Sequence, residues 1–302
     1  MQSATLKLLM MLAVTLAACQ PEGDTPTSGQ IAVVSCETIA PIVRKEVDEF
    51  QRIYEKTNVR MTVASTREAI AQLLRGEVKT IFVPRYLNEE EQALAARAEL
   101  KVDSFRIALE GLALVVSRKN PLNGLTLPQL GAIYRGETRN WREMGGAQLQ
   151  VLPLALSRNT AAAEMFLRAV VHDTVFARSA YVCSTSTQLL ATVAQREDAL
   201  GFVGMSWLSD YLLPADSARN KVKVLTLADS AGAEYQLLHQ STIYRNEYPL
   251  RRALYILSTD RSLGVAIGLI SFSTSAQGQK LVLNAGLVPV TMPIKLVKFG
   301  GS

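Results

Sequence analysis

Histidine and cysteine side chains are common metal ligands and nucleophiles. The 302-residue chain has only two histidines and three cysteines. His172 and His239 lie far apart in the sequence, and neither stands in a metal-ligand motif. A Gly-x-Ser-x-Gly nucleophile elbow is also missing from the sequence. The sequence therefore predicts neither an enzyme nor a metal site, and it requires no cofactor.

Cys19 ends the run Leu16-Ala17-Ala18-Cys19, which follows a positive charge at Lys7 and an apolar stretch at 8–14. The stretch is too short to span a bilayer, and the whole arrangement is typical of a secretory signal. Its ending resembles the bacterial lipobox, in which the cysteine is acylated and becomes the mature N-terminus. We expect a lipoprotein signal peptide over residues 1–19 and a protein anchored by lipid at Cys19, in the periplasm or at the cell surface. An ordinary cleaved signal is the alternative, and the choice of leaflet stays open.

Cys36 and Cys183 are the other two cysteines. An oxidising envelope would permit a disulfide between them, but they are distant in the chain and geometry decides. Two separate buried thiols are the favoured interpretation, and the pairing stays open.

The composition is that of a folded protein, with 48% hydrophobic and 20% charged residues. Residues 20–30 are poor in apolar residues and rich in turn formers, which predicts a flexible tether. The remainder is long enough for two domains. The net charge of +5 comes without basic clusters or interleaved aromatic residues, so no nucleic-acid partner is predicted. An anionic ligand is compatible with this charge.

Hydrophobic periodicity predicts alternating strands and helices at the start of the folded part. We expect strands at 31–34, 59–63 and 80–83, and helices at 39–57, 67–75 and 88–99, the last capped by Asn88. Such alternation favours parallel strands joined by right-handed crossovers.

A second block of the same kind follows, and the chain then returns to the first. We expect strands at 112–116, 150–155, 200–203 and 253–257, and helices at 127–134, 162–171, 187–196 and 263–285. The segments 109–115 and 244–254 would cross between the two lobes as a hinge. The expected architecture is α/β with two lobes: residues 31–111 and 247–302 form lobe 1, and residues 112–246 form lobe 2.

Several segments resemble a known family, in the same order along most of the chain. They are Gly111–Val116 with Lys119–Asn123, Leu125–Leu130, Ile133–Gly136, Asn140–Trp141, Ala199–Gly204, Tyr248–Tyr255, Ile270–Phe272, Ala276–Lys280 and Gly286–Val290. The family is that of the phosphate-binding solute receptors of bacterial ABC importers, of periplasmic-binding-protein type II fold. The resemblance implies two lobes, each a mixed, mostly parallel sheet flanked by helices, joined by a two-strand hinge.

The resemblance also implies a ligand site at helix N-termini, which favour anions. Its residues would be Cys36, Glu37, Thr38, Ser65, Thr66, Arg85, Arg158, Asn159 and Thr160. Related receptors carry hydroxyl groups after the arginine, where this chain has Ala161-Ala162-Ala163. Glu37 would repel a phosphate unless it accepts the proton of monohydrogen phosphate, which would select against sulfate.

Several of these residues, and others in the matching segments, also have a simpler structural interpretation. Thr38, Ser65 and Thr66 suit helix caps, Glu37 and Arg158 could face solvent, and Trp141, Gly136 and Pro249 suit packing and turns. The two remaining arginines, Arg67 and Arg85, could pair with Glu68 and Glu89.

The resemblance implies a monomeric receptor that captures inorganic phosphate, or a similar oxyanion, between its lobes. It would deliver the anion to the permease of an ABC importer without making or breaking a bond. Two alternatives stay open: a receptor for a different oxyanion or small acid, and an envelope lipoprotein of the same fold without a transport role.

Overall fold

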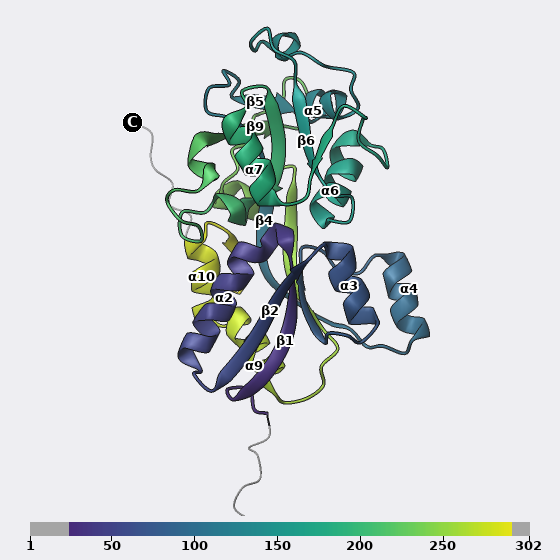
Figure 1. The fold of residues 1–302 in the computed structure, drawn as a ribbon, viewed down its shortest axis with the longest axis vertical. Helices are drawn as coiled ribbons and strands as arrows, with labels where there is room; N and C mark the ends of the chain where they lie inside the picture. The colour runs from purple at the N-terminus through teal and green to yellow at the C-terminus, as the bar shows by residue number, and fades with distance from the viewer. Residues whose placement is uncertain (1–23, 292–302) are drawn as a thin grey trace, which may run out of the picture.

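The computed structural model describes residues 24–291. The lipidation site predicted at Cys19, the signal peptide and the first residues of the tether lie outside this range. The described chain forms two lobes (Figure 1). The predicted α/β two-lobed fold is confirmed. Within residues 24–291, no helix has both the length and the apolar character needed to cross a membrane.

Lobe 1 is built around the strands β1 (Gly29–Cys36), β2 (Thr57–Ala64), β3 (Thr80–Val83) and β10 (Arg251–Ser258), with the first half of β4 (Asp103–Ser117). β1 pairs in parallel with both β2 and β3, as the alternation predicted. β10 returns antiparallel between β3 and β4. Since β1 begins at Gly29, the strand includes the last two residues of the expected tether.

The helices of lobe 1 cover both faces of this sheet. They are α2 (Ala40–Ile53), α3 (Thr66–Leu74), α4 (Glu89–Arg97), α9 (Val265–Thr274) and α10 (Ala276–Asn284). Asn88 caps α4 through a capping box with Glu91, which confirms the predicted start.

The single helix expected at 263–285 is wrong. Ser275 has an extended backbone and its side chain caps α10, so the chain turns between α9 and α10. Gly278 permits this turn, because a Cβ there would lie 2.4 Å from the carbonyl oxygen of Phe272.

Lobe 2 uses the second half of β4, which pairs antiparallel with β8 and β9. The order of strands continues from β8 through β6 to β7, in parallel. The strands of lobe 2 are β5 (Gly124–Thr126), β6 (Leu152–Leu156), β7 (Tyr181–Cys183), β8 (Ala199–Gly204) and β9 (Val222–Ala228). Its helices are α5 (Leu127–Tyr134), α6 (Ala161–Phe166), α7 (Ser186–Gln195) and α8 (Gln240–Tyr244). The last strand, β11 (Val288–Pro289), pairs with β4 in lobe 1. The sequence patterns missed the short elements β5, β7 and α8, and also β9.

Each lobe has its own hydrophobic core. In lobe 2, Phe166 stacks on Phe202 with ring centroids 4.1 Å apart, and Tyr134 packs edge-on against Phe166. The Tyr134 hydroxyl donates to the carbonyl oxygen of Leu154 at 2.8 Å. Trp141 is buried, in agreement with its interpretation as a packing residue. Cys36 and Cys183 are separate buried thiols, so the favoured interpretation of the cysteines is confirmed.

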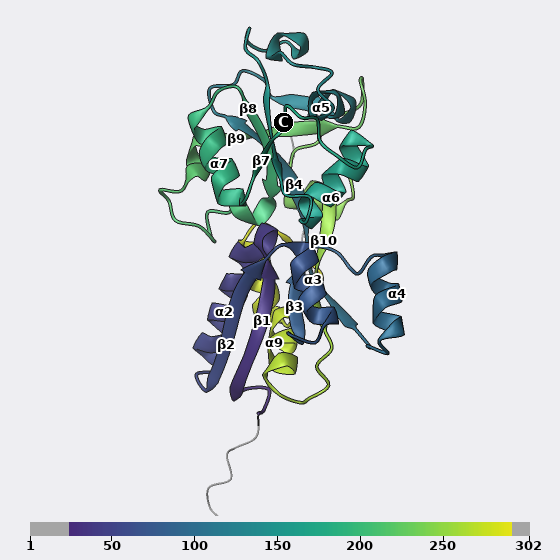
Figure 2. The same cartoon turned by 45° about the vertical axis from the view of Figure 1, so that its right-hand side comes forward.

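β4 and β10 connect the two lobes (Figure 2). β4 is a continuous strand of 15 residues whose first part belongs to the lobe 1 sheet and whose last part belongs to the lobe 2 sheet. This strand therefore links the two sheets and brings their loop-bearing ends together.

Candidate functional site

The candidate site lies where the carboxyl ends of the parallel strands of the two lobes meet. In lobe 1, β1 leads into a short 3-10 turn, Glu37–Ile39, and β2 leads into α3. In lobe 2, β6 leads into α6 and β7 leads into α7. Ligands of α/β proteins bind at this end of a parallel sheet. The family resemblance implies three ligand loops, and each follows a strand end: the first loop (35–41) follows β1, the second (64–66) follows β2 and the third (157–160) follows β6.

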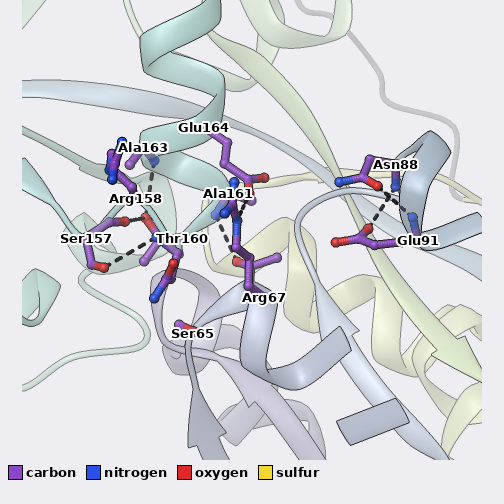
Figure 3. A network of polar contacts seen from close by, with 12 residues as sticks. Ser65, Arg67, Asn88, Glu91, Ser157, Arg158, Thr160, Ala161, Ala163 and Glu164 are labelled. Atoms are coloured by element: carbon purple, nitrogen blue, oxygen red, sulfur yellow. Dashed lines mark hydrogen bonds and ion pairs between the residues drawn. The ribbon is translucent and has the colours of Figure 1, made fainter. Parts of the chain in front are cut away.

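The second and third loops contact one another directly (Figure 3). The backbone N–H of Ala161 donates to Oγ1 of Thr66 at 2.9 Å. The N–H of Arg67 donates to the carbonyl oxygen of Asn159 at 3.0 Å. Thr66 is fully buried by this contact. Its hydroxyl is thus held between the lobes at the position where the resemblance places a ligand contact.

Glu37 reaches across the cleft to the first residue of α7. Its carboxylate accepts the backbone N–H of Ser186 at 2.7 Å and the Ser186 hydroxyl at 3.0 Å. Burial raises the pKa of Glu37, and the two bonds from Ser186 offset this rise only in part. Glu37 does not face solvent: a carboxylate from lobe 1 occupies a helix N-terminus of lobe 2, which is a favourable place for an anion.

Glu164 makes the reciprocal contact, from lobe 2 to lobe 1. Its Oε1 accepts from Nε of Arg67 and its Oε2 accepts from Nε of Arg85, each at 2.7 Å. The remaining nitrogens of the Arg85 guanidinium donate to Glu91 at 2.7 and 2.9 Å. The interpretation that Arg67 and Arg85 form ion pairs is confirmed, but the expected partners, Glu68 and Glu89, are wrong.

Arg85 stays charged in this setting. Burial by itself would lower its pKa, but the hydrogen bonds to Glu91 and Glu164 outweigh the burial and raise it. Burial raises the pKa of the neighbouring Cys36 thiol to about 12, so this cysteine is neutral at pH 7. As a neutral thiol, Cys36 can donate a weak hydrogen bond.

Ser65 and Thr160 are helix caps. The Ser65 hydroxyl accepts the N–H of Glu68, and the Thr160 hydroxyl accepts the N–H of Ala163 at 3.2 Å. Arg158 is exposed and makes a long contact, 3.4 Å, with the carbonyl oxygen of Thr174. The structure thus does not bring the Arg158 guanidinium into the contacts around Thr66 and Glu37.

Thr38 is buried, and its Oγ1 has no hydrogen-bond partner within residues 24–291, so it does not act as a helix cap. The carbonyl oxygen of Thr38 lies close to Gly204, where a Cβ would be only 2.6 Å from it. The same Cβ would lie 3.1 Å from Glu110 Oε1 and from Arg252 Nη2. The first loop therefore sits against the end of β8, beside the side chains of Glu110 and Arg252.

A buried ion pair at the hinge escaped the sequence interpretation. Arg252 on β10 donates from Nε and Nη2 to Oε1 of Glu110 on β4, at 2.9 and 2.5 Å. Nη1 of Arg252 has no partner among the described residues. Burial raises the pKa of Glu110, and the charge of Arg252 counteracts it. The available signal was Glu110, a lone charge within the apolar run 107–116, which faces Arg252 in the register of β4 and β10.

Two cavities flank Glu164. The smaller has a volume of about 300 Å³ and is lined by charged side chains from both lobes and the hinge: Arg85, Glu164, Arg168, Arg251 and Arg252. The larger, of about 720 Å³, is lined by Arg67, Arg158, Glu164, Arg168 and Asp173, among others. Arginines outnumber carboxylates in both linings, so both cavities favour anions. Groups of side chains that could hold a metal are absent from residues 24–291.

Comparison with known proteins places these features in a family. Residues 20–277 match the profile of the PBP superfamily domain. The chain is 22% identical to the phosphate-binding protein PstS of Pseudomonas aeruginosa over 288 residues, which is 90% of this chain and 85% of that protein. It is also 22% identical to the protein SphX of Synechococcus elongatus, over 87% of this chain and 79% of that protein.

Solved structures share the fold. A substrate-binding protein from Clostridium perfringens with bound phosphate superposes with a TM-score of 0.74 at 18% identity, over 87% of this chain and all of that chain. An ABC-type phosphate transport receptor from Vibrio cholerae gives a TM-score of 0.65 at 22% identity, with the same coverage.

Proposed function

Because the chain belongs to the PBP superfamily, we propose that it is an extracytoplasmic substrate-binding protein that captures inorganic phosphate between its lobes. It would then deliver the phosphate to the permease of an ABC importer. The observation that carries the proposal is the pair of lobe 1 arginines, Arg67 and Arg85, that converge on an oxyanion group between the lobes. Guanidinium groups suit carboxylate and phosphate oxygens alike. The PstS relative and the phosphate-bound structure supply the identity of the ligand.

The proposed binding residues are those of the loops at the cleft: Cys36, Glu37, Thr38, Ser65, Thr66, Arg85, Arg158, Asn159 and Thr160. Thr38 brings a buried hydroxyl that has no partner within residues 24–291, and such a group gains a full hydrogen bond when a ligand supplies an acceptor. Glu37 would accept the proton of monohydrogen phosphate and so disfavour sulfate, which has no proton to donate.

We further propose that the protein is a monomer held at the membrane by lipid on Cys19. It would have no catalytic role, because phosphate is bound and released unchanged. Several hydrogen bonds to a charged ligand, at about 1.5–3 kcal/mol each, are available to offset its desolvation.

Isothermal titration calorimetry on the purified protein, freed of bound ligand, tests this function. Phosphate would be titrated against arsenate and sulfate, and we expect micromolar or tighter binding of phosphate with little heat from sulfate. Arg85→Ala should abolish binding and Arg158→Ala should weaken it. Arg52→Ala is the matched control, since Arg52 also pairs with a glutamate, Glu49, but within one helix. Absence of heat with all three anions would refute phosphate capture and favour the envelope role without transport.

A further inference from the structure

Glu164 forms ion pairs with two arginines of lobe 1, Arg67 and Arg85. Both of its carboxylate oxygens accept from the Nε of an arginine of the other lobe, each at 2.7 Å. Two oxygens of a phosphate would be held by the same two guanidinium groups in the same way. The carboxylate thus already satisfies the cationic groups that the proposed function assigns to the anion.

Two cavities with space for an anion border Glu164. The cavity on the hinge side, about 300 Å³, equals the liquid volume of roughly ten water molecules, at about 30 Å³ each. That is ample for a tetrahedral oxyanion. The other cavity is larger and also borders Glu164. An anion in either cavity is next to the groups that bind Glu164.

Arg168 borders both cavities. It follows Glu164 by four residues along the helical segment 161–171, a spacing that places the two side chains on one face. Arg168 is exposed, whereas Arg252 is buried against Glu110. The Arg168 guanidinium is therefore free to turn toward an anion that has entered from solvent.

We infer that Glu164 is a built-in competitor of the anionic ligand, and that Arg168 is a further anion-binding residue. The inference rests on the proposed function and refines it. A tetrahedral oxyanion takes the Nε–H groups of Arg67 and Arg85, and the Glu164 carboxylate moves into water. Without the anion, Glu164 adds an ionic contact to the hydrogen bonds that join the lobes. Competition lowers the affinity for every anion by the same factor, since each anion must first displace Glu164.

Glu164→Gln in the full protein tests the competition, because glutamine keeps the shape and removes the charge. With inorganic phosphate as the probe, we expect the dissociation constant to fall by at least about fivefold, the lower end of typical coupling between sites. Arg168→Ala should raise it by a similar factor. Glu137→Gln and Arg44→Ala are the controls: Glu137 pairs with Arg135 inside lobe 2, and Arg44 is exposed on α2. Neither control borders the two cavities, and neither should change the affinity.

Small-angle X-ray scattering without any phosphate separates this inference from the proposed function. We expect a larger radius of gyration for Glu164→Gln than for the wild type, since the variant loses the ionic contact between the lobes. If neither protein binds phosphate but the variant opens, phosphate capture is wrong and the internal contact stands. If the wild type binds phosphate and Glu164→Gln binds it equally or more weakly, the competition is refuted while the receptor stands. An unchanged affinity in Arg168→Ala refutes the role of that arginine.

Discussion

Glu46 in α2 is a fully buried carboxyl group that should make stability depend on pH. Neither of its oxygens has a hydrogen-bond partner within residues 24–291. Burial raises its pKa from 4.5 to about 8, and the nearby Ser273 offsets this only in part. The folded protein therefore carries this group protonated at pH 7, whereas the unfolded chain carries it ionised.

The size of the effect follows from the two pKa values. Because the pKa is raised on folding, the native state is favoured fully below pH 4.5 and loses that advantage as the pH rises toward 8. Proton linkage between these values gives a cost of about 0.8 kcal/mol at pH 5 and about 3.3 kcal/mol at pH 7. The free energy of unfolding should therefore fall by about 2.5 kcal/mol over this interval from Glu46 alone.

Urea denaturation of the wild type and of Glu46→Leu at pH 5 and pH 7 measures how much of the pH dependence of stability comes from Glu46. Leucine needs no polar partner, so the variant should gain stability relative to the wild type, by about 2.5 kcal/mol more at pH 7 than at pH 5. Glu37 and Glu110 also have raised pKa values, but they remain in both proteins and cancel in the comparison. Glu46→Gln controls for charge, although its amide would be buried without a partner. An equal difference in stability at the two pH values would refute the reasoning.

Three further predictions concern the hinge and the lobe 2 core. Glu110→Ala leaves Arg252 buried and unpaired, and should cost about 3–5 kcal/mol in urea denaturation; a loss below about 1 kcal/mol would contradict a dry ion pair. Tyr134→Phe removes a buried hydroxyl that donates to a backbone carbonyl, and should cost about 1–1.5 kcal/mol, with an unchanged melting curve counting against it. Gly204→Ala puts a Cβ 2.6 Å from the carbonyl oxygen of Thr38, so its scattering without ligand should show lobes further apart, and an unaltered radius of gyration would show that the first loop can move aside.

Local sequence signals predicted many of the elements well. The helix expected at 127–134 and the strand expected at 80–83 have the predicted bounds. Each depends on signals within a few residues, such as the capping box between Thr126 and Gln129. The break at Ser275 was not predictable in this way, because helical periodicity continues across it. It depends on the packing of Gly278 against the end of α9.

The site was predictable only as a set of loops. Parallel strands place their carboxyl ends together, so the loops after β1, β2 and β6 could be expected to meet. The ion-pair partners of the arginines near these loops could not be predicted. Arg67 and Arg85 both pair with Glu164, 97 and 79 residues away, and Arg85 also pairs with Glu91 rather than with Glu89. Contacts between the lobes depend on the relative orientation of the two sheets that share β4, and local sequence patterns do not predict this orientation.

The place of β10 in the lobe 1 sheet has a consequence during synthesis, because the N-terminal part of the chain is made first. β3 and the first half of β4 become neighbours only through β10, which follows β3 by about 170 residues. In the meantime both strands have an unpaired edge, and such edges are templates for pairing with other chains. The strands of lobe 2 are all present by then. A nascent chain of this protein therefore passes through a long stage with one lobe complete and the other open to aggregation.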